Sequence, residues 1–242
     1  MQNLQKILFI DIETVPMTSS FDDLSEDMQE LWKIKFELLS KRMPEKHIEN
    51  SVGKSFMSSA GIFAEFGKVI CISVGIIAEQ KDGNILRITS YANNDERVLL
   101  TDFKVLIEKF FTSNNHNFCG HNIKEFDIPY ICRRMIINNI PLPQALNING
   151  KKPWEVNLLD TLDFWKFGDY KNYTSLKLLS TVLGIPTSKD DIDGSQVASV
   201  YYHDSNLPRI VTYCQKDVLA TAQVWLKMNG FSLVKPENVV FV

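Results

Sequence analysis

Two carboxylates stand two positions apart near the start of the chain, at Asp11 and Glu13. They follow the apolar run 7–10, whose β-favouring residues predict a strand that continues through Glu13. Residues two apart in a strand point to the same face, so the two carboxylates project together. Like charges repel in a partly buried site, and a divalent cation that prefers oxygen ligands, such as Mg²⁺ or Mn²⁺, removes that cost. A solvated strand end would explain the same two acids, and the pair alone does not separate these interpretations.

A second polar group, the segment 120–127 with the sequence GHNIKEFD, lies between a predicted short strand and a predicted helix. It ends on Asp127, two residues before Pro129, and proline is tolerated in the first turn of a helix. Aspartate is a favoured N-cap residue, and Asn122 is an ordinary turn residue. Taken by itself, the segment therefore favours a structural role.

Near the C-terminus, Tyr213 and Asp217 are four positions apart in a helix predicted over 207–228. Residues at this spacing lie on the same side of a helix, so a phenol and a carboxylate would face one site. An ordinary surface pair, or a core tyrosine beside a solvated aspartate, has the same spacing. This motif is weak when it stands alone.

The elements that must position these residues follow from hydrophobic periodicity and turn signals. Strands are predicted at 6–13, 69–77, 85–92, 117–120 and 155–159, and a hairpin turn at 81–84. Helices are predicted at 21–42, 95–111, 128–139, 207–228 and from a cap at Thr174 to Gly184. Residues 43–61, which contain Pro, Gly and several serines, are predicted to be a loop. The order indicates an α/β fold with a mixed sheet, in one domain over 1–242 with 17–66 as a helical or loop insertion.

Composition and charge narrow the possible functions. The chain is 45% hydrophobic and 23% charged, as in globular proteins that form a core without disulfide support. Its net charge of −3 argues against a protein that coats duplex nucleic acid by neutralising phosphates. That charge does not exclude an enzyme whose carboxylates bind metal ions. The four scattered cysteines form no C-x-x-C pair, which favours free thiols in a reducing compartment.

Two segments bear on location and on substrate access. The apolar run 7–10 is interrupted by Asp11 and is too short for a signal peptide or a membrane span. We therefore expect a cytoplasmic protein without membrane association. The insertion at 17–66 is locally basic, and either a flap over an incoming strand or a solvated, charge-rich helix would explain it.

The order of the three groups along the chain is more specific than any one of them. Three motifs occur in the order that resembles the DEDD superfamily of 3′→5′ exonucleases: Asp-x-Glu from Asp11, Asn-x-x-x-Phe-Asp from Asn122, and Tyr-x-x-x-Asp from Tyr213. The tyrosine resembles the subclass that has Tyr, rather than His, before the last Asp. The sequence around Asp11 is similar to the proofreading exonuclease domain of family B DNA polymerases, here expected to stand without a polymerase. The resemblance spans 7–228 apart from most of 17–66.

This resemblance implies a ribonuclease-H-like fold, with a mixed five-stranded sheet flanked by helices. It also implies a two-metal mechanism in which two Mg²⁺ or Mn²⁺ ions, about 3.5–4 Å apart, are held by Asp11, Glu13, Asp127 and Asp217. One ion would lower the pKa of the attacking water, and the other would stabilise the leaving 3′ oxygen. Tyr213 would orient the water, because a phenol with a pKa of about 10 is a poor base at neutral pH.

By the same resemblance, Thr14 and Asn122 would touch the terminal nucleotide. Phe126 would stack on a base or pack in the core, and we favour the core. Asp160 is expected to be structural or to contact a metal ligand, and Asp190, Asp191 and Asp193 are expected to face solvent. His121 and His203 are expected to be structural, although His121 could reach a phosphate.

The predicted substrate is the 3′ end of a single strand, because unpaired bases reach a narrow metal site more easily than paired ones. DNA is favoured over RNA, with a role in proofreading or repair. An RNA-trimming enzyme of the same superfamily and a catalytically silent nucleic-acid-binding domain are the alternatives. All four carboxylates and Tyr213 are present, which counts against the silent domain. No sequence motif identifies a polymerase or helicase partner.

Overall fold

A computed structural model describes residues 3–42, 51–80, 83–169, 171, 173–186 and 191–242. Within these residues the chain forms one six-stranded mixed sheet. In their order across the sheet, the strands are β5 (Leu158–Asp160), β4 (Asn117–Gly120), β1 (Ile7–Pro16), β2 (Gly67–Ala78), β3 (Ile85–Ala92) and β6 (Val239–Phe241). The pairs β1/β2 and β2/β3 are antiparallel, whereas β1/β4, β4/β5 and β3/β6 are parallel. The predicted mixed α/β fold is confirmed, with one strand more than the five expected.

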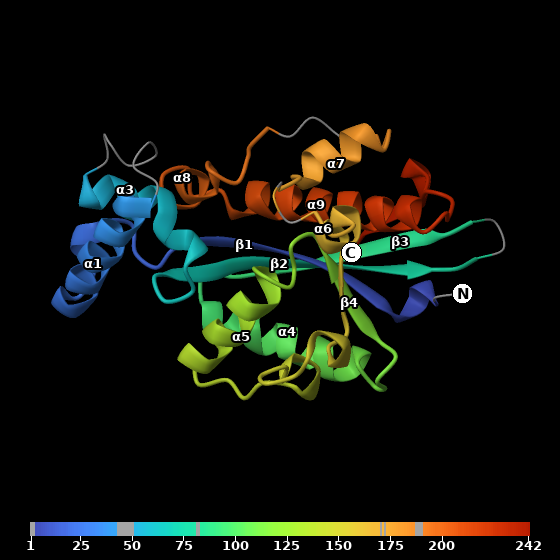
Figure 1. Ribbon diagram of the computed structural model, residues 1–242, viewed down its shortest axis with the longest axis horizontal. Helices are drawn as coiled ribbons and strands as arrows, with labels where there is room; N and C mark the ends of the chain where they lie inside the picture. Colours follow the sequence, from blue (N-terminus) through green and yellow to red (C-terminus); the bar gives the residue numbers. More distant parts are fainter. Residues whose placement is uncertain (1–2, 43–50, 81–82, 170, 172, 187–190) are drawn as a thin grey trace.

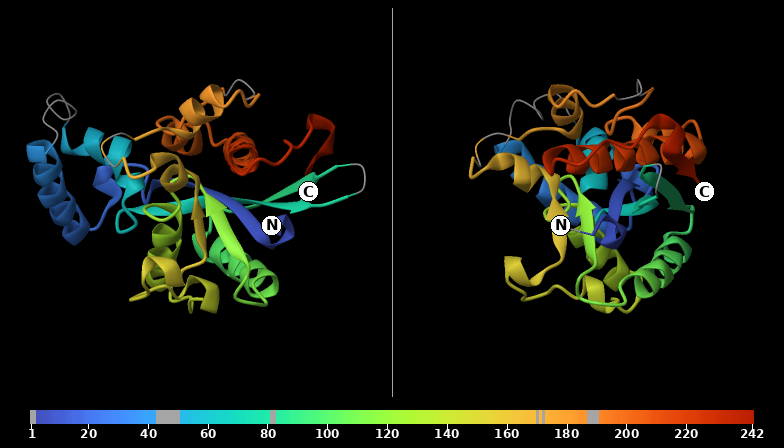
Figure 2. Two further views of the ribbon diagram at one scale, coloured as in Figure 1. Left: turned by 45° about the vertical axis from the view of Figure 1, so that its right-hand side comes forward. Right: turned by 90° about the vertical axis from the view of Figure 1, so that its right-hand side faces the viewer.

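Helices cover both faces of this sheet. The α-helices are α1 (Glu26–Arg42), α3 (Val52–Ser59), α4 (Glu96–Phe110), α5 (Asp127–Ile137), α6 (Thr161–Lys166), α7 (Leu176–Val182), α8 (Val197–Tyr202) and α9 (Leu207–Met228). In Figure 1, α4 and α5 lie below the sheet, α6 to α9 lie above it, and α1 and α3 lie at one end. The end-on view in Figure 2 shows the same three layers.

Strand β1 runs through the middle of the sheet, and its side chains alternate between the two helix layers. Ile10 is buried in a core cluster with residues of α4 and α5, whereas Phe9 is buried in a cluster with residues of α9. The odd-numbered positions of β1 therefore face α9. Asp11 and Glu13 are two of these positions, so the fold directs both carboxylates toward α9.

Helix α9 packs on the sheet through a stripe at helical spacing: Ile210, Cys214, Val218, Ala222 and Trp225. Tyr213 and Asp217 each precede a stripe residue by one position. At about 100° per residue they lie at the edge of the buried face, where they meet both the core and the solvent. Although α9 has 22 residues, its apolar residues lie on one side. Among the described residues, no helix is long and apolar enough to cross a membrane.

The described residues of 17–66 form a small helical unit around their own core. Trp32 is fully buried beside Phe56 and Phe66, and its indole N–H donates a hydrogen bond to the Val52 carbonyl at 3.2 Å. The predicted loop over 43–61 is wrong in its second half, where Ser51 caps α3. Burial of Phe56 explains the difference, because tertiary packing overrides the weak helix propensity of serine and glycine. Residues 43–50 lie outside the described residues.

Three further elements differ from prediction for local reasons. Strand β5 begins only at Leu158, because the preceding Pro153–Glu155 form a 3-10 turn. The helix expected to be capped by Thr174 is capped by Ser175, whose hydroxyl accepts a hydrogen bond from the Leu178 N–H at 3.2 Å. Strand β6 is three residues long and pairs only with β3, so it has too few positions for alternation to be recognised. The pairing of β2 and β3 as a hairpin, strand β4 and helix α9 are confirmed. Residues 81–82 of the predicted hairpin turn lie outside the described residues.

Candidate active site

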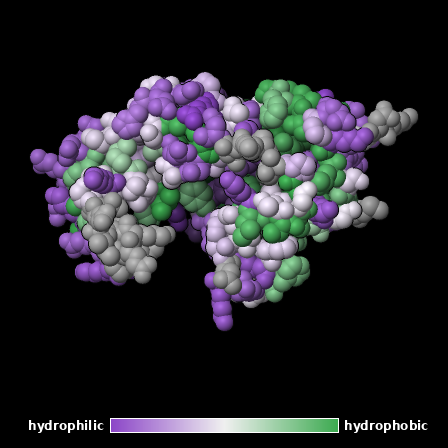
Figure 3. Space-filling view, turned by 90° about the horizontal axis from the view of Figure 1, so that it is seen from above, coloured by the Kyte–Doolittle hydropathy of each residue, from purple (hydrophilic) through white to green (hydrophobic). Residues whose placement is uncertain are grey.

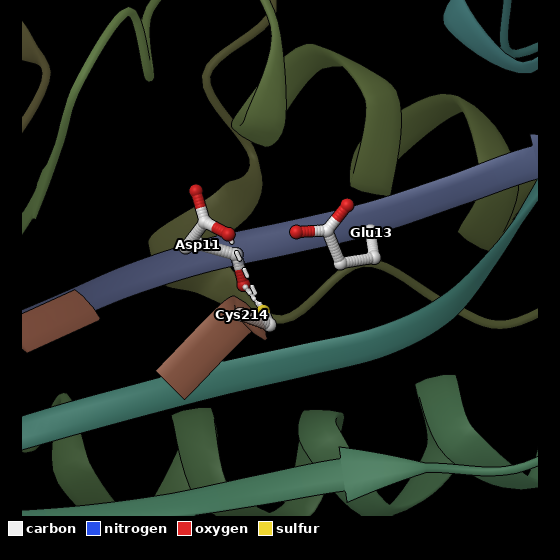
Figure 4. Close-up of side chains that lie close together, drawn as sticks. All are labelled: Asp11, Glu13 and Cys214. Atoms are coloured by element: carbon white, nitrogen blue, oxygen red, sulfur yellow. Dashed lines mark hydrogen bonds between the residues drawn. The ribbon is translucent and has the colours of Figure 1, made fainter. Parts of the chain in front are cut away.

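The carboxylates of Asp11 and Glu13 project from β1 with Cys214 of α9 beside Asp11 (Figure 4). In the ladder with β2, Asp11 is opposite Ser73 and Glu13 is opposite Cys71, and the register shifts directly after Glu13. Such bulges redirect side chains and are common beside active sites. Ligand atoms of Asp11, Glu13 and Cys214 lie within 4.8 Å of one another. Strand geometry therefore brings the first predicted motif to a single point.

Helix α9 contributes three polar side chains to this point. The Cys214 thiol donates to the Asp11 side chain at 3.3 Å and lies 3.4 Å from the Asp11 carbonyl. Burial raises the pKa of this thiol, so it remains a neutral donor that holds the Asp11 carboxylate. Tyr213 and Asp217 are joined by a side-chain hydrogen bond. The second half of the site is thus built by the i, i+4 spacing of one helix.

Asp127 reaches the same site from the first turn of α5. The N-cap of that helix is Phe126, so capping does not explain the aspartate. Asp127 is 4% exposed, and a hydrogen bond with the Ile12 backbone ties it to β1. The residue is therefore a buried acid held against the strand that carries Asp11 and Glu13.

The buried Asp160 shapes the turn that leads to Asp127. Its carboxylate accepts hydrogen bonds from the backbone N–H groups of Asn122 at 3.0 Å, Lys124 at 3.1 Å and Leu162 at 2.9 Å. Asn122 has a φ of 66°, a left-handed conformation that asparagine tolerates better than most residues. Asp160 is therefore structural, as predicted.

The acids of the site raise one another's pKa. Burial is the largest cause of the raised pKa values of Asp11 and Glu13, and the negative charge of Asp217 is the next cause for both. Burial also raises the pKa of Asp127 to about 7, with Asp217 among the charges that act on it. The four predicted carboxylates are therefore close enough to repel one another. Buried acids with raised pKa values mark candidate functional sites, and a bound cation would remove the repulsion.

A cleft of about 320 Å³ opens beside two of these acids, Asp11 and Asp217. Residues of several elements line it, among them Asp11, His121, Tyr173, Lys177, Tyr213, Lys216 and Asp217. In the space-filling view from the α7–α9 side, the surface is mostly polar with scattered apolar areas, and a notch separates the α1–α3 end from the rest (Figure 3).

The three predicted substrate residues do not line this cleft as the structure describes it. The Thr14 hydroxyl donates to the Gly61 carbonyl at 2.8 Å. Phe126 packs partly buried against the core, with its ring centroid 5.4 Å from that of Tyr130, which agrees with the favoured core role. Nucleotide contacts by Thr14 and Asn122 stay predictions.

The acids expected to face solvent behave differently from those of the site. Asp191 is exposed and forms an ion pair with Arg209 at 2.8 Å. Asp193 is exposed at the margin of the cleft, and His203 is also exposed. Asp190 lies outside the described residues. Asp191 and Asp193 are therefore solvated, as predicted, whereas His203 was expected to be structural and is exposed instead.

Two residues of the site were not identified from the sequence. Cys214 lies inside the Tyr-x-x-x-Asp motif, and the α9 stripe would have placed its thiol against β1 if the packing of α9 had been known. Tyr173 lies in a loop before α7, and loops lack the strand or helix periodicity that predicts the direction of a side chain. No sequence signal would have placed it at the cleft.

The raised pKa of Asp127 predicts that this residue contributes less to the stability of the metal-free protein as the pH rises. The folded state binds this proton more tightly than the unfolded state, whose aspartate has a pKa of about 4. The contribution of Asp127 to stability is therefore greatest below pH 4 and falls toward pH 7, with a slope of about 1.4 kcal/mol per pH unit. Urea unfolding in EDTA from pH 4 to pH 8 measures this slope.

Asp127→Asn is the matched control, because it keeps the shape of the side chain and cannot ionise. The difference in unfolding free energy between the variant and the wild type should grow with pH and level off above about pH 7. Added Mg²⁺ or Mn²⁺ should reduce it. A difference that is independent of pH would contradict the raised pKa.

The mixed six-stranded sheet with helices on both faces defines a protein of ribonuclease-H-like fold. Residues 62–234 match a family described as predicted 3′-5′ exonucleases related to the exonuclease domain of PolB, and the chain belongs to this family. No curated protein matches the chain. The matched range contains Asp127, Tyr213 and Asp217, whereas β1 with Asp11 and Glu13 precedes it. The structure therefore adds the strand that completes the site.

Proposed function

We propose that the protein is a metal-dependent 3′→5′ exonuclease that removes nucleotides from the 3′ end of single-stranded DNA by two-metal phosphodiester hydrolysis. The observation that carries this proposal is the convergence of four carboxylates from β1, α5 and α9: Asp11, Glu13, Asp127 and Asp217. They are far apart in the sequence and repel one another where they meet. Repulsion of this kind is costly unless the site serves a cationic ligand.

The donor atoms fit hard divalent cations. Carboxylate oxygens are the ligands that Mg²⁺ and Mn²⁺ prefer. The charges that raise the pKa values of Asp11 and Glu13 are negative, so a cation would lower both pKa values and favour the ionised forms. The Cys214 thiol is a softer donor, and its raised pKa keeps it protonated. We therefore assign the four carboxylates as metal ligands and Cys214 as the donor that positions Asp11.

The chain's own groups would place the reacting atoms. When bound, two divalent ions would lower the pKa of the attacking water and stabilise charge on the phosphate and the leaving oxygen. Burial and the charge of Asp217 raise the pKa of Tyr213, so its hydroxyl keeps its proton. A phenol in that state orients water by a hydrogen bond and is not a general base.

The substrate proposal follows from the size of the cleft and from the family. A volume of about 320 Å³ is at the lower end of ligand pockets and suits one nucleotide better than a base pair. A single strand can place one nucleotide in a cleft of this size without the cost of separating a duplex. The relation to the PolB exonuclease domain favours DNA over RNA. The polymerase or helicase partner, the role in repair and the cytoplasmic location stay predictions.

The test uses matched single-stranded DNA and RNA oligonucleotides labelled at the 5′ end, with free or blocked 3′ ends. The protein is incubated with each in Mg²⁺, in Mn²⁺ and in EDTA, beside Asp217→Ala and the control Glu79→Gln, which replaces an exposed acid at the end of β2. A metal-dependent ladder from free 3′ ends that Asp217→Ala lacks would support the proposal. Faster RNA shortening would change the substrate to RNA, and binding without shortening would indicate a silent domain.

Tyr213→Phe should lower kcat by about 10- to 100-fold, the typical cost of losing alignment at a reacting centre. The pH dependence of kcat should keep its shape, because the raised pKa of Tyr213 prevents titration near neutral pH. Steady-state rates from pH 6 to pH 9 measure both quantities. Loss of an alkaline or acidic limb in the variant would instead identify Tyr213 as a proton-transfer group.

A further inference from the structure

Tyr173 is an exposed aromatic residue at the cleft that the chemistry above does not use. It is 66% exposed and shares the cleft with Asp11 and Asp217. Partial burial raises the pKa of its phenol, and the negative charges of Asp127 and Asp160 raise it further. The ring therefore lies within electrostatic reach of the acid cluster while most of its surface stays uncovered.

The loop that carries Tyr173 is held by His121. The Nε2 atom of His121 is 2.9 Å from the Thr174 carbonyl, and Nδ1 is 2.9 Å from the Thr161 hydroxyl. A carbonyl only accepts, so Nε2 carries the proton of this hydrogen bond. The His121 ring also packs edge-on against Tyr173, with centroids 6.3 Å apart. Ser175 caps α7 directly afterwards, so the chain that follows Tyr173 is fixed.

We propose that Tyr173 is the surface on which the base of the 3′-terminal nucleotide stacks, and that His121 positions it. This inference rests on the proposed function, because the phosphate at the carboxylates determines where the sugar and base lie. The cleft has room for about one nucleotide, so a base beside Tyr173 belongs to the nucleotide that is removed. Every base has a π-face, so stacking tolerates any terminal base. A purine, which has the larger face, would bind more tightly than a pyrimidine.

The experiment compares two single-stranded DNA oligonucleotides that differ only in the last nucleotide, which either carries a base or is abasic. The ratio of their kcat/KM values isolates the contribution of the base. For the wild type we expect a ratio of about 5- to 100-fold in favour of the base-bearing end, from the usual strength of base–aromatic stacking. The ratio should fall to near one in Tyr173→Ala and remain in Tyr173→Phe. Trp154→Ala, which removes an aromatic that is 77% exposed and outside the lining of the cleft, should keep the wild-type ratio.

Variants of His121 separate positioning from packing. His121→Ala should lower the ratio mainly through KM, because the loop loses its anchor while the carboxylates stay in place. His121→Gln retains an N–H donor near the Nε2 position and should restore part of the ratio. In the double variant His121→Ala/Tyr173→Ala the ratio should be no lower than in Tyr173→Ala, since both changes remove the same interaction.

The outcomes distinguish this inference from the proposed function. If the wild type shortens the oligonucleotides and Tyr173→Ala keeps the wild-type ratio, stacking on Tyr173 is overturned and the exonuclease proposal stands. An equal loss of rate on both oligonucleotides also overturns it, because a structural defect does not depend on the terminal base. If the wild type shortens neither oligonucleotide in Mg²⁺ or Mn²⁺, the proposed function fails and this inference fails with it.

Discussion

Replacing Asp11 with Asn is expected to lower the exonuclease rate at least about a thousandfold, because one metal ligand contributes several kcal/mol of charge stabilisation. The same change should raise the stability of the metal-free protein. Asp11 is held among Glu13, Asp127 and Asp217, whose negative charges disfavour its ionised form. An amide of the same shape removes one charge from this cluster. Single-turnover rates in Mn²⁺ and urea unfolding in EDTA at pH 8 measure the two effects.

The opposite signs of these effects make the prediction specific. A substitution that only damages the fold would lower activity and stability together. Glu79→Gln, at an exposed position, is the control and should change neither. Near-normal activity in Asp11→Asn would show that the carboxylate has no metal-binding role. A lower urea midpoint in EDTA would show that repulsion within the acid cluster does not destabilise the metal-free protein.

The residues of the site could be predicted from the sequence because local periods determine their directions. Asp11 and Glu13 share a face through the period of two in a strand, and Tyr213 and Asp217 share a side through the helical period. These local rules need no knowledge of the rest of the fold. Neither rule shows that this face of the strand lies against this side of the helix. Only the order of the motifs, which resembles that of a known family, indicated that the two groups form one site.

Features that depend on contacts between distant segments were not predictable in the same way. Helix α3 forms in a serine-rich stretch because Phe56 is buried beside Trp32, and strand β6 exists because it pairs with the edge of the sheet. Tyr173 reaches the cleft because His121 holds the following carbonyl across a long sequence separation. Local propensity carries no information on such contacts.

A buried ion pair that the sequence did not indicate holds α4, α5 and β2 together. Glu96 and Arg134 are 7% and 5% exposed, and the Glu96 carboxylate accepts hydrogen bonds from Arg134, from the Val69 N–H at 2.7 Å and from the Asn138 amide at 2.9 Å. Arg134 also donates to the Ala64 carbonyl at 2.9 Å, next to the end of the 17–66 unit. The pair therefore joins the helix layer below the sheet to the point where this unit returns to β2.

Glu96→Ala should destabilise the protein by about 3–5 kcal/mol, because it leaves the Arg134 charge buried without its partner. For a chain of this length, that loss corresponds to a melting temperature lower by roughly 10 °C. The Val69 N–H also loses its acceptor, which adds to the cost of the change. Thermal and urea unfolding at neutral pH measure the loss.

Two comparisons test whether the buried charge is the cause. Glu96→Leu/Arg134→Met should regain much of the stability that Glu96→Ala loses, because apolar groups of similar volume replace a buried pair at little net cost. The exposed pair Glu30–Lys33, whose side chains are 68% and 50% exposed, is the control, and Glu30→Ala should cost less than about 0.5 kcal/mol. The double variant could instead be as unstable as Glu96→Ala. The unpaired charge of Arg134 would then not be the cause of the lost stability. The cause would be the hydrogen bonds of Glu96 to the Val69 backbone and to Asn138, because both variants lack them.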